Sequence, residues 1–65
     1  MNYQMIKALC TDANNAARNG DNLIAARFVA MCFTRYSAAP VDVTENCTKE
    51  AIRAYNDNHA EVRKG

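Results

Sequence analysis

The 65-residue chain lacks the sequence patterns that accompany a catalytic centre. With only two glycines, it has no glycine-rich loop of the kind that binds phosphate groups. It also has no Ser, His and Asp set and no paired carboxylates of the kind that support hydrolysis. A helical fold of this length leaves little room for a substrate cavity of several hundred Å³. We therefore expect that the protein is not an enzyme and holds no cofactor.

An excess of charge of one sign is also missing. Eight Lys and Arg residues stand against seven Asp and Glu residues, which gives a formal net charge of +1. A protein that binds nucleic acid or a membrane surface by electrostatic attraction normally carries a clear basic excess. The charge balance therefore argues against both kinds of partner. With 49% apolar residues and interspersed charges, the chain is also unlike a disordered one.

The first ten residues lack the basic segment, the long apolar run and the cleavage site of a secretory signal. The chain has three cysteines, an odd number that cannot form a closed set of disulfides. Free thiols on apolar faces fit a reducing compartment. The most apolar segment, residues 23–36, is too short to cross a bilayer. We expect a cytoplasmic protein with no membrane partner.

What the chain does have is helical periodicity over most of its length. Residues 2–18 place apolar side chains on one side and polar side chains on the other, as in an amphipathic helix. Asn19 and Gly20 end this helix, since glycine readily takes the left-handed conformation after a helix C-terminus. Asp21 can then cap a second helix over residues 22–37. The short turn predicts an antiparallel helical hairpin.

A third helix is predicted after a linker at residues 38–42, because the proline there disfavours helix at the residue before it. Asp42 and Glu45 have the spacing of a capping box. Apolar residues then recur at helical spacing over residues 43–62. The sequence therefore predicts an all-α, single domain over residues 1–65, built as a three-helix bundle.

The candidate metal ligands are Cys10, Cys32, Cys47 and His59. Zinc prefers four such ligands in a tetrahedral arrangement. No pair among them has the short spacing that forms half a site in advance, and cysteine on an apolar face commonly acts as a small hydrophobe. Cys47 and His59 would also lie more than three turns apart on one helix, too far for a catalytic pair. We therefore predict neither a metal site nor a catalytic thiol.

The second predicted helix is apolar on most of its sides. Three large apolar side chains, Leu23, Ile24 and Met31, lie at the edge of its apolar arc. Arg27 and Arg35 lie on the same side. Methionine and arginine without acidic neighbours are typical of protein interfaces. Either the third helix covers this side or another molecule does.

A polar residue, Asn58, falls in the middle of the apolar arc of the third predicted helix. It is either a hydrogen-bonded core residue or a residue that sets the register of a symmetric dimer, as in coiled coils. A chain this short buries little apolar surface, so the stability of the monomer is marginal. This also favours association with a second copy. Our leading hypothesis is a homodimeric regulator or inhibitor that contacts a larger protein, as phage accessory proteins do.

The alternative hypothesis is a small DNA-binding regulator. Lys49, Arg53 and Asn56 share the outer face of the third predicted helix, and Arg and Asn side chains read guanine and adenine edges. Three acidic residues lie on or beside that face and would repel phosphates: Glu45, Asp57 and Glu61. The linker before this helix is also longer than the turn of a helix-turn-helix motif. The salt dependence of binding distinguishes the two hypotheses. DNA binding weakens steeply as the ionic strength rises, whereas an apolar protein interface should hardly respond.

Overall fold

The computed structural model describes residues 3–64, and all of the regular structure in this range is α-helical. The helices are α1 (Tyr3–Arg18), α2 (Asn22–Tyr36), α3 (Pro40–Asn46), α4 (Lys49–Asp57) and α5 (His59–Lys64). The all-α prediction is confirmed. Within these residues there are five helices rather than the three predicted. None of the helices in residues 3–64 has the length and apolar character needed to span a membrane.

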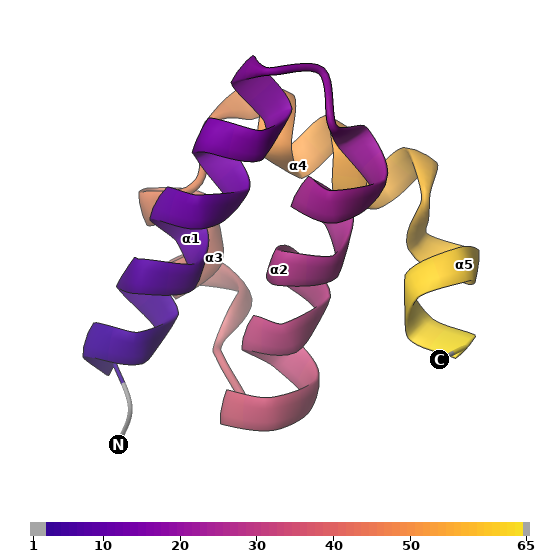
Figure 1. The fold of residues 1–65 in the computed structure, drawn as a ribbon. Coiled ribbons are helices and arrows are strands. Elements are labelled where there is room, and N and C mark those ends of the chain that lie inside the picture. The colour runs from indigo at the N-terminus through magenta and orange to yellow at the C-terminus, as the bar shows by residue number, and fades with distance from the viewer. Residues whose placement is uncertain (1–2, 65) are drawn as a thin grey trace.

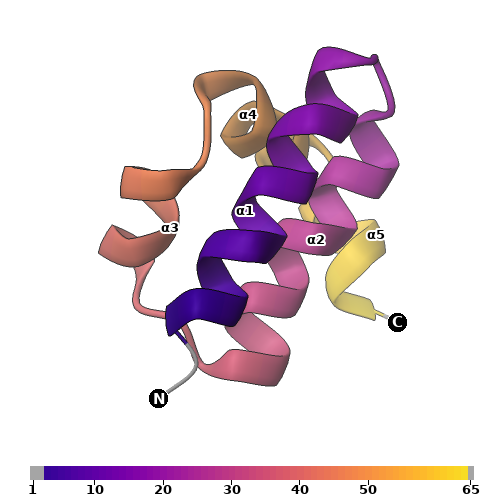
Figure 2. The ribbon, with the colours of Figure 1, turned by 60° about the vertical axis from the view of Figure 1, so that its left-hand side comes forward.

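Helices α1 and α2 form the predicted hairpin and run antiparallel (Figure 1). Figures 1 and 2 show α3 and α4 on one side of this hairpin and α5 along the outer edge of α2. The opposite face of the hairpin, which is toward the viewer in Figure 1, has no described helix over it. The predicted start of the first helix, at residue 2, lies outside the described residues.

The turn between α1 and α2 follows the sequence prediction. Gly20 has a φ of 84°, in the left-handed region that favours glycine. The amide of Gly20 donates to the carbonyl of Ala17 at 3.1 Å, and the amide of Asp21 donates to the carbonyl of Ala16 at 2.9 Å. These two bonds satisfy carbonyl groups that the helix end leaves open. Asp21 does occupy the N-cap position of α2, but the prediction that its side chain caps the helix is wrong.

The predicted linker at residues 38–42 is wrong in its extent, because α3 already begins at Pro40. Ala39 before it is extended, with φ −73° and ψ 144°, as the proline requires. Proline suits the first position of a helix, since its φ is already helical and its missing amide hydrogen would have no partner there. The helix therefore starts two residues before Asp42, and the predicted capping box does not form the N-terminus.

The predicted third helix over residues 43–62 is interrupted twice. The first interruption lies at Cys47 and Thr48, between α3 and α4. Thr48 is extended, and its hydroxyl accepts a hydrogen bond from the amide of Ala51 at 3.2 Å. A threonine in this role ends one helical segment and begins another, because it supplies the partner that the first turn lacks.

The second interruption is at Asn58, between α4 and α5. The side-chain amide of Asn58 donates to the carbonyl of Ala54 at 2.9 Å, and its backbone amide donates to the same carbonyl at 3.1 Å. The residue is half-buried. These local bonds account for a polar residue in the apolar arc without a second molecule.

Small side chains dominate the core, which lies between the hairpin and the short helices. Among the fully buried residues with the largest side chains are Val29 and Val43. Alanines let the helix axes approach closely. Phe33 of α2 packs on Tyr55 of α4 with ring centroids 5.6 Å apart. The buried core residues are Ile6, Leu9, Cys10, Ala13, Ala16, Ala17, Ala25, Val29, Cys32, Val43, Ala51 and Ala54.

Candidate functional site

The first candidate surface lies on α2 and is called the α2 surface. It consists of Leu23, Ile24, Arg27, Met31 and Arg35. Leu23 is 42% exposed and Ile24 is 48% exposed, so no described helix covers them. Both arginines are exposed and Met31 is half-buried. The sequence left open whether the third predicted helix or another molecule covers this side of α2. The structure shows that the C-terminal part of the chain does not cover Leu23 and Ile24.

The other end of the α2 surface meets α5. A hollow of about 350 Å³ lies between the two helices, with Glu61 and Val62 on the α5 side. Arg27, Met31 and Arg35 line the α2 side. The structure thus brings these three predicted residues together, while Leu23 and Ile24 lie at the N-terminal end of the same helix. Asn58, the remaining predicted interface residue, lies at the junction of α4 and α5.

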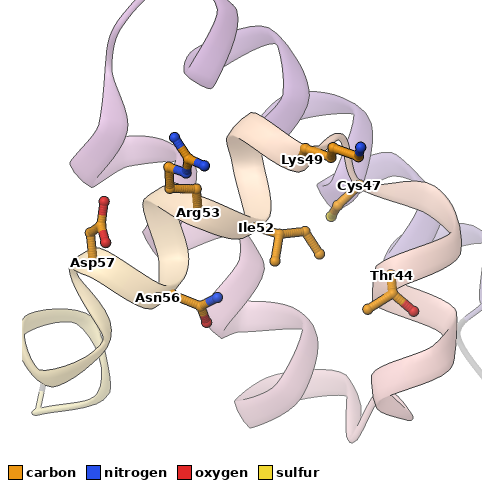
Figure 3. A pocket seen from close by; sticks show the side chains of 7 residues that line it. All are labelled: Thr44, Cys47, Lys49, Ile52, Arg53, Asn56 and Asp57. Carbon is orange, nitrogen blue, oxygen red and sulfur yellow. The ribbon is translucent and has the colours of Figure 1, made fainter.

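The second candidate surface is an open hollow of about 580 Å³ at the angle between α3 and α4, called the α3–α4 corner. Its lining consists of Thr44, Cys47, Lys49, Ile52, Arg53, Asn56 and Asp57. In Figure 3, Thr44 and Ile52 point into the angle between the helices, whereas Arg53 and Asp57 project from α4 away from it. The corner therefore has a partly apolar floor and charged groups along one side.

The residues of the DNA-binding hypothesis all line this corner. Lys49, Arg53 and Asn56 lie on α4 within two turns of each other, and all three are exposed. No hydrogen bond or ion pair joins the side chains of Lys49, Arg53 or Asp57 to another described residue. Both cations are thus available to a ligand, and Asp57 places an acidic group beside them.

A residue that the sequence assigns to solvent, Asn14 of α1, holds the corner in place. Its side-chain amide donates to the carbonyl of Asn46, the last residue of α3, at 3.0 Å. Its side-chain oxygen accepts from the amide of Thr48 at 2.8 Å. One half-buried side chain therefore satisfies backbone groups on both sides of the helix break. The only hint of this role in the sequence is Thr48, a residue type that favours helix N-caps.

The three thiols gather in the core behind the corner. Cys10 and Cys32 are fully buried, and Cys47 is half-buried. Burial, together with the nearby Cys10 thiol, raises the pKa of the Cys32 thiol from 9.0 to about 12. Burial, with a hydrogen bond to Cys10, raises the pKa of Cys47 in the same direction. The Cys32 and Cys47 thiols are therefore neutral near pH 7 and behave as part of the apolar core.

The candidate metal ligands do not come together as a set. His59 is exposed and packs edge-on against the ring of Tyr55, with centroids 5.3 Å apart. Among residues 3–64, no group of three or more His, Cys, Asp and Glu side chains is arranged to hold a metal ion. The aromatic contact accounts for the position of the histidine.

Comparison with known proteins assigns no family to the chain. No protein-family model matches it, and no curated protein and no solved structure matches it with significance. The α2 surface and the α3–α4 corner are therefore the basis of the proposals that follow.

Proposed function

We propose that the protein is a small cytoplasmic interaction module that forms a homodimer and regulates or inhibits a larger protein by direct contact. The observation that carries this proposal is the exposure of Leu23 and Ile24, 42% and 48%, beside the exposed side chain of Arg27. Burying apolar surface stabilises an interface by roughly 25 cal/mol for each Å². Arginine at the edge of an apolar patch is typical of protein interfaces.

A stable dimer would bury a large share of the surface of so small a molecule. A stable interface of standard size buries about 800 Å² of each partner. The molecule exposes 4384 Å² in total, so such an interface would take roughly a fifth of it. Leu23 and Ile24 alone cannot supply that area. The face of the hairpin that no described helix covers supports the proposal, because it offers further surface next to α2 (Figure 1).

Light scattering on a size-exclusion column tests the dimer. We expect a dimer whose mass is insensitive to salt and to a chelator, because its contacts are apolar. Ile24→Glu should give a monomer with unchanged helix content by circular dichroism. Val41→Glu is the matched control, because Val41 is 57% exposed on α3, outside the α2 surface, and should remain dimeric. A wild-type monomer would contradict the homodimer and leave the α2 surface to a different partner.

The alternative function, DNA binding, is supported by the placement of Lys49, Arg53 and Asn56 along α4. The sequence-based objection to it, a long linker, no longer holds, because only Cys47 and Thr48 separate α3 from α4. The nearly balanced charge still opposes it. A mixed-sequence duplex should bind weakly or not at all at low salt. Tight binding that falls steeply with salt would favour this alternative over the interaction module.

A further inference from the structure

We propose that the α3–α4 corner binds an acidic segment of a partner protein. In this arrangement a carboxylate of the segment lies along the charged side of the corner, beside Lys49 and Arg53, and an adjacent aliphatic or aromatic side chain reaches into the angle and packs on Ile52. The site is separate from the α2 surface, and the proposal does not depend on the homodimer.

The first support is that the corner is held in shape before any ligand arrives. The two bonds from Asn14 fix the end of α3 and the start of α4 relative to α1. Asn46 adds a second link to α1, because its side-chain amide donates to the hydroxyl of Tyr3 at 3.3 Å. The same amide donates to the carbonyl of Asp42 at 2.7 Å. A site held in this way loses less conformational entropy on binding than a mobile loop does.

The second support is the floor of the corner. Ile52 and Cys47 are both half-buried and line the hollow. The thiol of Cys47 is uncharged near neutral pH, since burial raises its pKa. Thr44 closes the opposite side from α3, as Figure 3 shows. This floor favours an apolar side chain over a phosphate or a sugar.

The third support is the pair of cations beside the floor. Lys49 and Arg53 are four residues apart on one helix, so their side chains leave on the same side of α4. Neither side chain forms an ion pair or a hydrogen bond with another described residue, although Glu50 and Asp57 lie beside them. A guanidinium can hold a carboxylate through two parallel hydrogen bonds, a geometry that an ammonium cannot offer. One acidic side chain is therefore the anion that this pair fits.

The charges of the corner favour a protein segment over DNA. DNA binding rests on many phosphate contacts, and the corner offers two cations. Asp57 and Glu50 lie beside those cations and are both exposed. They would repel a continuous row of phosphates but tolerate a single carboxylate with neutral or basic neighbours. A polypeptide segment in which an acidic residue adjoins an apolar residue can place a carboxylate beside the cations and an apolar side chain on the floor.

Nuclear magnetic resonance titration of the full chain with short blocked peptides tests the proposal. The probes are acetyl-Gly-Leu-Glu-Gly-amide, its Leu-Gln counterpart and its Leu-Lys counterpart, with a mixed-sequence DNA duplex as the fourth ligand. We expect backbone amide shifts from the Leu-Glu peptide that centre on Cys47, Ile52 and Arg53. The protein should bind this peptide roughly tenfold more tightly than the Leu-Gln peptide, because the glutamine cannot form the charge-assisted hydrogen bond that the glutamate forms.

Variants make the test specific. Arg53→Gln should remove the preference for the acidic peptide without a change in helix content, because the side chain is exposed. Arg35→Gln is the matched control, since it removes the same charge from an exposed position of α2 that does not line the corner, and it should keep the preference. Equal binding of the Leu-Glu and Leu-Gln peptides, shifts located elsewhere, or no shift with any peptide would overturn the proposal. Shifts of the corner amides by DNA alone would overturn it in favour of nucleic acid.

Dimerisation and peptide binding can fail separately. The Ile24→Glu variant should still bind the Leu-Glu peptide at the corner, because Ile24 does not line it. Loss of peptide binding in this variant with its fold intact would contradict the independence of the two sites.

Discussion

The hairpin and the C-terminal half of the molecule reach stability in different ways. Helices α1 and α2 have 16 and 15 residues, and a single glycine turn joins them. Helices α3, α4 and α5 have 7, 9 and 6 residues. Isolated helices of the latter lengths are not stable in water, because too few hydrogen bonds offset the cost of nucleation. The hairpin is therefore the scaffold, and the C-terminal half depends on contacts with it.

A charge at Val29 in the hairpin should have the largest effect. Val29 is 1% exposed, and an unpaired carboxylate at this position costs several kcal/mol. A domain of this length is expected to be stable by roughly 3–10 kcal/mol in all. We expect Val29→Asp to be unfolded by circular dichroism. Val41→Asp, at an exposed position of α3, should keep the wild-type spectrum, and a folded Val29→Asp protein would refute the role of the hairpin as scaffold.

The link between the two halves is tested by Asn14→Ala. This change removes both side-chain hydrogen bonds to the break between α3 and α4. We expect the free energy of unfolding in urea to fall by about 2 kcal/mol, since two backbone groups lose their partner. Asn15→Ala is the matched control, because the neighbouring asparagine is exposed and should change stability by less than about 0.5 kcal/mol. Equal effects of the two changes would argue against the role of Asn14.

Alkaline pH tests the buried thiols that lie where the halves meet. The unfolded chain releases the Cys32 proton near its ordinary pKa of 9.0, whereas the folded chain keeps it to about 12. Above pH 9 the unfolded state therefore binds fewer protons, and the free energy of unfolding falls as the pH rises. The slope should approach about 1.4 kcal/mol per pH unit for each such thiol. Below this range the contribution is constant.

Urea unfolding over this pH range measures the slope for the wild type and for Cys32→Ala. The variant should be less stable throughout, because a buried side chain is shortened, but its stability should fall less steeply with pH. The two proteins have every other side chain in common, so the contributions of those side chains cancel in the difference. Identical slopes would show that the Cys32 thiol keeps its ordinary pKa in the folded protein.

The smallest effect is expected at the cap of α4. Thr48→Ala removes the hydroxyl that accepts from the amide of Ala51 and should lower stability by about 1 kcal/mol. Thr48→Ser keeps the hydroxyl and should recover most of the loss. Thr11→Ala in the middle of α1 serves as control, because its hydroxyl bonds only within an exposed turn. A loss with Thr48→Ser as large as with Thr48→Ala would exclude capping as the cause.

The hairpin was predictable because its signals are local. The apolar spacing of α1, the glycine at position 20 and the residues that follow it act within a few positions of one another. The C-terminal half also contained local signals that the periodicity obscured. Pro40 suits the first turn of a helix, and Thr48 and Asn58 are residue types common at helix ends. The apolar arc runs on through Thr48 and Asn58, so periodicity alone predicts one helix where the structure has three.

The candidate surfaces were predictable to different degrees. The sequence places Leu23 and Ile24 at the edge of an apolar arc but leaves open whether the C-terminal part of the chain covers them, and only the structure shows them exposed. The α3–α4 corner did not follow, although Lys49, Arg53 and Asn56 were singled out. Its floor and its shape exist only because the chain breaks at Cys47, and that break was not foreseen.

The helical class and the hairpin with its glycine turn follow from the sequence alone, because apolar periodicity and turn residues act over a few positions. The tertiary structure decided where the C-terminal half breaks, how the corner forms and where the thiols meet. The corner is held by bonds from Asn14 to Asn46 and Thr48, which are 32 and 34 residues further along the chain. No local pattern encodes such a contact, because it exists only once α1 and the later helices have packed together.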